Sequence, residues 1–309
     1  MKLVDGVFEG GGVRGIAHVG AVKAIEDQGY SWNRLAGTSA GAIIAALLAS
    51  GYNAKELRVI MKELDYVRFL KKNWINYVPF IGQGLNLLFH EGFYKNTFQE
   101  QWLTEKLAHK NVYSFNDLEE CQLKIIVSDI TNNRMTIFPD DLEWYGETEE
   151  FSVAKAVTMS CTIPIYFQPI IWKTKQFSSP NLMVDGGLLS NFPIWIFDSP
   201  HIPRWPTFGF HFKREETVSR YSSGIFSIVK SLLSTMLQAH DYRHLDEEAL
   251  ARTILIPTDS ISSTDFGLTE GQKEWLYQAG YSSAYHFLVK WNFHDYITIF
   301  RNEFISSKK

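Results

Sequence analysis

The sequence has 309 residues, of which 45% are hydrophobic and 15% aromatic, and its formal net charge is -4. This size suits one large globular domain, and the slightly acidic balance argues against a nucleic-acid partner. Two cysteines, Cys121 and Cys161, are too few for a disulfide framework and favour a reducing compartment. The longest apolar run, around 40–50, is too short to span a bilayer, and the charged start opposes a secretory signal. We therefore predict a cytoplasmic protein with a single domain, residues 1–309.

The first part of the chain alternates predicted strands and helices. Residues 3–8 predict a strand, which is followed by a glycine-rich turn and a helix that ends near Gly29. Residues 32–36 predict a second strand, which leads through a second tight turn into an apolar helix. Two adjacent strand–turn–helix units place both turns at the same edge of a parallel sheet.

The later elements are less strongly patterned. Residues 54–72 predict an amphipathic helix, and 69–81 then mixes two lysines with aromatic and aliphatic residues. The region 54–107 has two interpretations, a mobile cap that lines an acyl pocket and contacts lipid, or a connection packed into the core. Further strands are predicted at 123–127, 135–138, 207–212 and 253–256, and further helices at 153–160, from Asn191, at 222–251 and at 271–291, before a loose tail at 305–309.

The second turn reads Gly37-Thr38-Ser39-Ala40-Gly41, which is Gly-x-Ser-x-Gly. A serine on a tight strand-to-helix turn adopts a strained backbone, and small neighbours such as Gly37 and Gly41 avoid a steric collision there. The turn sets the Ser39 hydroxyl at a helix N-terminus, where the helix dipole favours developing negative charge. An ordinary glycine-flanked turn would fit the pattern alone, but the strand–helix context favours a nucleophile.

The first turn, Glu9-Gly10-Gly11-Gly12-Val13-Arg14-Gly15, also has two interpretations. Gly10-x-Gly12-x-x-Gly15 fits a dinucleotide-binding fingerprint, which requires a second strand ending in an acidic residue. That strand runs instead into Gly37-Thr38-Ser39, so the acid is missing. The alternative is an oxyanion hole made by the N–H groups of Gly10, Gly11 and Gly12, with Arg14 adding positive charge or positioning the loop. We favour the oxyanion hole.

These two motifs, together with a third, resemble the patatin-like phospholipase family. The third is Asp185-Gly186-Gly187, which follows the apolar run 182–184. The stretches 128–131 and 156–164 are also similar to the family. The similarity covers about 3–197 and continues weakly to about 287. Residues 198–309 are expected to form the C-terminal helices, beside the strands predicted at 207–212 and 253–256, and carry no motif with an assignable chemistry.

The resemblance implies an α/β fold of three layers, αβα, with a central, mostly parallel sheet. It also implies a Ser-Asp dyad, in which Ser39 attacks an acyl carbonyl and Asp185 accepts the serine proton directly, without a histidine or a metal. Gly186 and Gly187 would let Asp185 approach the serine turn closely, and Gly15, Gly37 and Gly41 complete the motifs. The implied substrates are acyl chains of phospholipids or lysophospholipids, with no cofactor, and the predicted partners are lipid and a membrane surface contacted from the periphery.

Other residues offer weaker alternatives. His18 is expected to pack inside, and Cys161 has no neighbouring histidine to activate it. His240 and His244 have a spacing compatible with metal binding, but their charged neighbours favour a solvated helix face. Two other functions compete with hydrolysis. An effector or binding protein whose activity is silent or needs an activator is disfavoured because every motif residue is present, and a dinucleotide-dependent oxidoreductase lacks the acidic residue.

Overall fold

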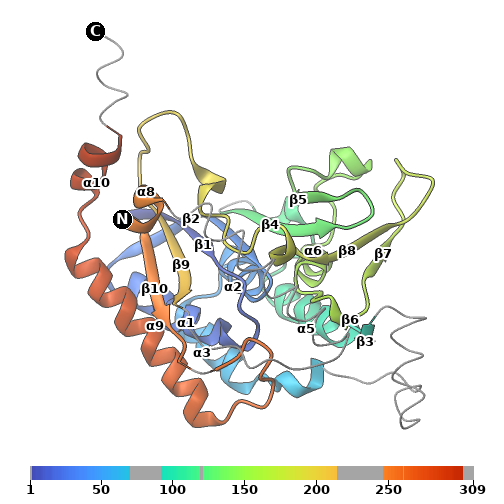
Figure 1. Cartoon of the computed structure of the whole chain (residues 1–309), viewed down its shortest axis with the longest axis horizontal. Coiled ribbons are helices and arrows are strands. Elements are labelled where there is room, and N and C mark those ends of the chain that lie inside the picture. Colours follow the sequence, from blue (N-terminus) through green and yellow to red (C-terminus); the bar gives the residue numbers. More distant parts are fainter. Residues whose placement is uncertain (1, 70–91, 119–120, 214–245, 260, 302–309) are drawn as a thin grey trace, which may run out of the picture.

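A computed structural model describes residues 2–69, 92–118, 121–213, 246–259 and 261–301. Its centre is an eight-stranded sheet with the order β10-β9-β1-β2-β4-β8-β7, in which β5 also pairs with β4 (Figure 1). A second, two-stranded sheet joins β3 and β6. The strands of the main sheet are β1 (Lys2–Phe8), β2 (Tyr30–Thr38), β4 (Gln122–Asp129), β5 (Arg134–Phe138), β7 (Ile170–Trp172), β8 (Asn181–Asp185), β9 (Thr207–Lys213) and β10 (Thr253–Pro257), and those of the small sheet are β3 (Gly92–Tyr94) and β6 (Ile165–Phe167).

The main sheet is parallel over β10, β9, β1, β2 and β4 and becomes antiparallel where β5, β8 and β7 join. In the register of β1 and β2, Phe8 lies opposite Gly37. The glycine-rich turn after Phe8 and the serine turn after Thr38 therefore lie at the same edge of the sheet, as the sequence predicts.

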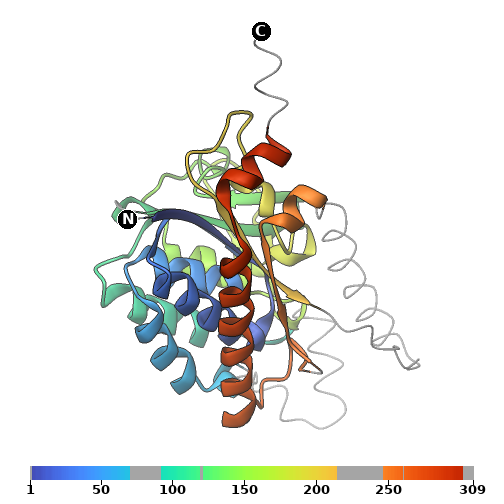
Figure 2. The ribbon, with the colours of Figure 1, turned by 90° about the vertical axis from the view of Figure 1, so that its left-hand side faces the viewer.

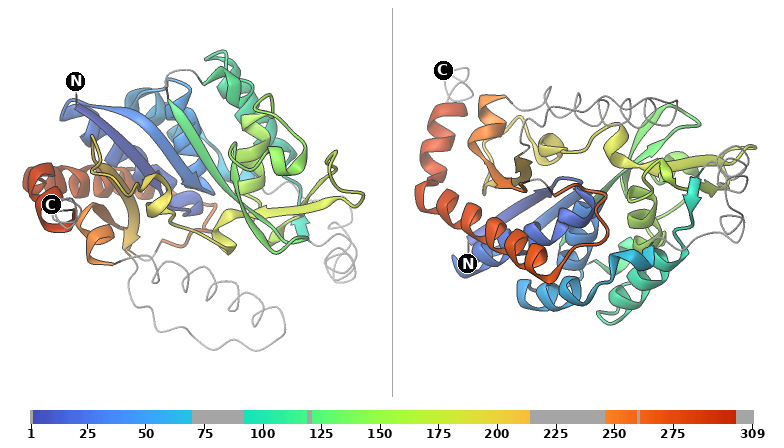
Figure 3. Two further views of the ribbon diagram at one scale, coloured as in Figure 1. Left: turned by 90° about the horizontal axis from the view of Figure 1, so that it is seen from above. Right: turned by 60° about the horizontal axis from the view of Figure 1, so that its bottom comes forward.

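Helices cover the first face of the sheet, where α9 packs along α1 and α2 packs on β1, β2 and β4 (Figure 2, Figure 3). Val4 and Phe8 of β1 point into this layer. The helices are α1 (Gly15–Asp27), α2 (Ala40–Ala49), α3 (Ala54–Glu63), α5 (Thr97–Ala108), α6 (Val153–Ser160), α8 (Glu247–Ala251), α9 (Glu270–Lys290) and α10 (Phe293–Phe300).

The second face of the sheet carries a smaller apolar cluster. Val7 of β1 and Ala36 of β2 pack there against Phe192, the 3-10 helix η7 (Ile194–Phe197) and Ala249 of α8. The strands β1 and β2 are thus buried on both faces, as expected for parallel strands in a three-layer protein. The predicted α/β class with a central, mostly parallel sheet is confirmed.

Several predicted elements differ from the structure. The helix predicted over 54–72 ends at Glu63, because Leu64 turns to an extended backbone (φ -68°, ψ 116°) before the 3-10 turn η2 (Tyr66–Phe69). The helix predicted from Asn191 is only the short η7, which Pro193 precedes. The helices α5 and α10 have no counterpart among the predicted elements. Most of the segments predicted at 69–81 and 222–251, and the tail at 305–309, lie outside the described residues.

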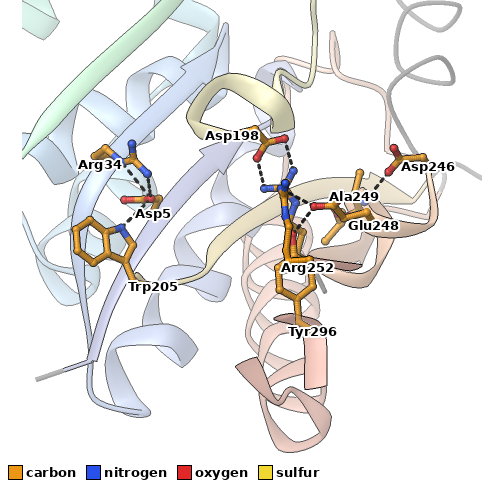
Figure 4. Close-up of polar contacts among 11 residues, drawn as sticks. Asp5, Arg34, Asp198, Trp205, Asp246, Glu248, Ala249, Arg252 and Tyr296 are labelled. Carbon is orange, nitrogen blue, oxygen red and sulfur yellow. Dashed lines mark hydrogen bonds and ion pairs between the residues drawn. The ribbon is translucent and has the colours of Figure 1, made fainter. Parts of the chain in front are cut away.

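The C-terminal elements are tied to the sheet by ion pairs and hydrogen bonds (Figure 4). The Arg252 guanidinium, just before β10, donates two hydrogen bonds of 2.6 Å to Asp198 beyond η7. The Tyr296 hydroxyl of α10 donates to Glu248 of α8 at 2.8 Å.

Within the described ranges, no helix combines the length and the apolar character needed to cross a membrane.

Candidate active site

Ser39 occupies the turn between β2 and α2 with a backbone conformation of φ 53° and ψ -124°. A positive φ is uncommon for a residue with a side chain, and it persists only where the surrounding structure imposes it. Here the surroundings are tightly packed. A Cβ atom on Gly37 would lie 2.3 Å from the Gly41 carbonyl oxygen, and one on Gly41 would lie 2.2 Å from that of Phe8. The two glycines let the end of β1, the turn and the start of α2 approach one another.

Asp185 is the last residue of β8, and the sheet register brings it toward Ser39. Thr38 lies opposite Ile126 on β4, and the next residue of β4, Val127, pairs with Asp185. The backbone N–H of Asp185 donates to the Thr162 carbonyl at 2.8 Å, which fixes the strand end.

The Asp185 carboxylate is almost fully buried. Burial raises its pKa from 3.8 to about 6, and the Ser39 hydroxyl and the N–H of Gly187 oppose this rise. Oδ1 accepts from Gly187 N–H at 2.8 Å. Oδ2 makes no hydrogen bond of standard geometry with a described residue, although the Ser39 hydroxyl is close enough to lower the pKa of Asp185. Catalytic hydrogen bonds are often poorly aligned before substrate binds, so this oxygen is suited to accept the serine proton.

The glycine-rich loop lies against the serine turn. A Cβ on Gly10 would be 3.1 Å from the Ser39 Cβ, and Gly15, the first residue of α1, lies against Ala40. The N–H of Gly10 donates to the Asn191 carbonyl at 3.1 Å and is therefore occupied. The N–H groups of Gly11 and Gly12 donate to no acceptor in the described part of the chain. Of the three predicted oxyanion donors, Gly11 and Gly12 therefore keep an N–H without an acceptor among the described residues.

Arg14 holds this loop in place. Its Nε and its backbone N–H both donate to the Gly11 carbonyl at 3.2 Å, and its guanidinium carbon lies 4.8 Å from the centre of the Phe212 ring. Of the two roles predicted for Arg14, these contacts are those of a residue that positions the loop.

Ser160 holds the serine turn by a hydrogen bond, a contact that the sequence did not predict. The Ser39 N–H donates to Ser160 Oγ at 2.9 Å, and that hydroxyl donates to the Ile126 carbonyl at 2.6 Å. Ser160 thus links the strained turn to β4, and the Ser39 N–H is not free to bind an oxyanion. The family-like stretch 156–164 contains Ser160, but 121 residues separate it from Ser39, so only the fold shows its role.

Cys161 is buried near Ser39 and Asp185. Burial and the charge of Asp185 raise the pKa of its thiol well above 9, outweighing interactions with Gln99 and Ser39. A thiol that remains protonated is a poor nucleophile. That Cys161 does not attack the substrate stays a prediction.

The histidines do not complete a triad in the described ranges. His18 is fully buried, and its Nε2 bonds the Glu9 carbonyl at 2.9 Å. Burial lowers the pKa of His18 to about 4, so the ring is neutral at pH 7. No group of three His, Cys, Asp or Glu side chains is arranged to hold a metal ion among the residues described, and His240 and His244 lie outside them.

The protein is of the α/β class. Two glycine-bearing turns lie at one edge of its mostly parallel sheet, and a buried aspartate lies beside the serine turn. The chain belongs to the patatin-like phospholipase family, whose model matches residues 6–198.

Individual relatives extend this similarity. The chain is 39% identical over 294 residues to the uncharacterized protein YqhO of Bacillus subtilis, covering 94% of this chain and 99% of that protein. It is 25% identical over 200 residues to lysophospholipase NTE1 of Scheffersomyces stipitis, covering 62% of this chain but only 11% of that protein. Among solved structures, VipD from Legionella pneumophila has a similar fold, with a TM-score of 0.57 and 16% identity over 93% of this chain and 66% of that chain.

Proposed function

We propose that this protein is a serine acyl-ester hydrolase that acts on phospholipids or lysophospholipids through a Ser39–Asp185 dyad. One observation carries the proposal: Ser39, in a strained turn, interacts with a buried carboxylate whose pKa of about 6 leaves it ionised at neutral pH. A serine hydroxyl becomes an effective nucleophile when such a base accepts its proton. Membership of the family and similarity to a lysophospholipase support a lipid substrate.

The proposed reaction has two halves. Ser39 Oγ attacks the acyl carbonyl carbon while its proton passes to Asp185, and the N–H groups of Gly11 and Gly12 stabilise the oxyanion. When the intermediate collapses, Asp185 returns this proton to the leaving alcohol oxygen, and the acyl group remains on Ser39. Asp185 then removes a proton from water, which attacks the acyl-serine, and it returns this proton to Ser39 Oγ as the acyl–oxygen bond breaks and the fatty acid leaves.

A cytoplasmic location with peripheral membrane contact is part of the same proposal. Both cysteines are free and buried, which suits a reducing compartment. Contact with the membrane surface would bring the enzyme to its lipid substrate.

The test compares the wild type with Ser39→Ala and Asp185→Asn on p-nitrophenyl butyrate and on palmitoyl-lysophosphatidylcholine. We expect turnover by the wild type and a loss of at least about 10³-fold in kcat for each variant, since nucleophile and base act as a unit. Ser50→Ala is the matched control, because Ser50 ends the same helix that Ser39 begins and its hydroxyl donates to the Leu47 carbonyl. Full activity of Ser39→Ala would disprove the dyad, and a folded wild type that hydrolyses neither ester, with or without lipid vesicles, would favour a binding or effector role.

A further inference from the structure

Asn191 connects the segment that carries Asp185 to the glycine-rich loop. Its carbonyl accepts from Gly10 N–H at 3.1 Å, and its Nδ2 donates back to the Gly10 carbonyl at 3.4 Å. The same Nδ2 donates to Glu9 Oε1 at 2.8 Å. Asn191 is buried, and 181 residues separate it from Gly10. The backbone carbonyl of Asn191 therefore holds the N–H of Gly10, and its side chain holds the carbonyl of Gly10.

These contacts fix the directions of the loop N–H groups. In a trans peptide the C=O and the following N–H point in opposite directions. When Asn191 holds the Gly10 carbonyl, the N–H of Gly11 must point away from Asn191. Arg14 holds the Gly11 carbonyl at 3.2 Å and orients the N–H of Gly12 in the same manner. The two N–H groups proposed to bind the oxyanion thus belong to the two peptides whose carbonyls are restrained.

Glu9 in turn holds the Asn191 side chain. Its carboxylate is fully buried, and its Oε2 accepts from Phe212 N–H at 2.5 Å and lies 2.9 Å from His211 Nδ1. These contacts fix the Glu9 side chain in place, so it can hold the Asn191 amide in one orientation. The packing leaves little space for another arrangement, because a Cβ on Gly10 would lie 2.4 Å from Asn191 Oδ1.

We propose that Asn191 is a positioning residue, which acts by directing the Gly11 N–H toward the oxyanion, with Glu9 holding its amide, while Arg14 directs the N–H of Gly12. The inference rests on the proposed hydrolase function. A donor set in place before reaction stabilises the transition state more than the bound substrate. A purely structural role for Asn191 would change stability and leave the turnover of the folded enzyme unaltered.

The first test measures kcat, KM and inhibition by an alkyl trifluoromethyl ketone, whose adduct with a serine carries an oxyanion. For Asn191→Ala we expect kcat to fall about 10²-fold and KM to change less than about threefold, because one misdirected donor costs about that much. The inhibition constant should rise by the same factor as kcat falls. Asn181→Ala is the control, since Asn181 is also a buried asparagine, at the start of β8, and should alter stability without changing kcat.

A second variant keeps the test decisive if Asn191→Ala folds poorly. Asn191→Asp combined with Glu9→Gln exchanges the donor and the acceptor of this pair, so their hydrogen bond is retained, but the aspartate cannot donate to the Gly10 carbonyl. We expect this double variant to fold and to keep a low kcat. If the double variant or folded Asn191→Ala keeps the wild-type kcat while Ser39→Ala is inactive, the role proposed for Asn191 is overturned and the proposed function stands. Turnover that survives Ser39→Ala would instead overturn the proposed function.

Discussion

Asp185 holds its carboxylate where burial disfavours the charge that its proposed role requires. Its pKa of about 6 is set mainly by burial, and the Ser39 hydroxyl and the Gly187 N–H lower it only in part. As a base the group must be ionised, so kcat/KM of the wild type should increase with pH through about 6 and then level off. The free energy of unfolding depends on the same proton, but it decreases as the pH rises.

The unfolded chain ionises this carboxyl near its ordinary pKa of 3.8, and the folded chain does so near 6. Between these values the folded state binds more protons than the unfolded state, so the free energy of unfolding falls as the pH rises. The difference corresponds to about 3 kcal/mol of stability, fully present below the lower pKa and lost above the higher one. The buried base therefore makes the active form of the protein the less stable form.

We predict that Asp185→Asn unfolds at higher urea concentration than the wild type at about pH 8, with a gap of up to about 3 kcal/mol that closes toward about pH 4. The asparagine keeps the acceptor for the Gly187 N–H and has no charge to bury. Urea unfolding across this pH range measures the gap. Asp140→Asn, at an exposed ion pair with Lys124, serves as the control and should show no such gain. An Asp185→Asn variant less stable than the wild type at about pH 8 would contradict the prediction.

Two helices meet at glycines where α1 crosses α9. A Cβ on Gly20 would lie 1.9 Å from the Tyr277 carbonyl oxygen, and one on Gly280 would lie 1.8 Å from that of Ala17. These contacts are reciprocal and involve backbone atoms, which cannot rotate aside. In an exposed helix, alanine would stabilise by about 1 kcal/mol relative to glycine. At this crossing the steric cost should exceed that gain, because the helices must separate.

We therefore predict that Gly20→Ala and Gly280→Ala each destabilise the protein by about 1 to 3 kcal/mol. Gly271→Ala provides the matched control within α9, since its new Cβ would have no neighbour closer than 4.0 Å. This third variant should be neutral or slightly more stable than the wild type. Thermal unfolding of the three variants ranks them, and equal midpoints for all three would show that the helices do not approach closely here.

Features set by local sequence could be predicted, whereas features set by contacts between distant elements could not. The two strand–turn–helix units and the positions of Ser39 and Asp185 were predicted, because glycine-flanked turns and apolar periodicity are local properties. Ser160 and Asn191 were not predicted, because each contacts the candidate site through hydrogen bonds to a segment more than a hundred residues away. The glycines of α1 and α9 look like weak points in a helical pattern, and only the crossing of the two helices explains them.

The C-terminal third of the chain contributes to the sheet and its core, although the family model ends at residue 198. The strand β9 pairs with β1, and its side chains Phe208, Phe210 and Phe212 are fully buried. The ring of Phe210 stacks on that of Phe8 at 4.5 Å. Farther out, Trp205 donates to the buried Asp5 of β1 at 2.9 Å (Figure 4). We propose that residues 1–309 form one folding unit, in which the later strands close the core begun by β1.

A fragment of residues 1–198 tests this proposal, and we predict that it does not fold. Burying one phenylalanine contributes about 1.5 to 3 kcal/mol, so losing the three of β9 removes an amount comparable with the entire stability of a typical domain. Near-UV circular dichroism and urea unfolding of the fragment should show no fixed aromatic packing and no cooperative transition. Phe210→Leu in the full chain is the graded control, expected to fold with a loss of about 1 to 2 kcal/mol. A cooperative transition in the fragment would mean that the glycine-rich loop, the serine turn and Asp185 assemble without β9, although β1, which leads into that loop, would then have lost its neighbour on one side.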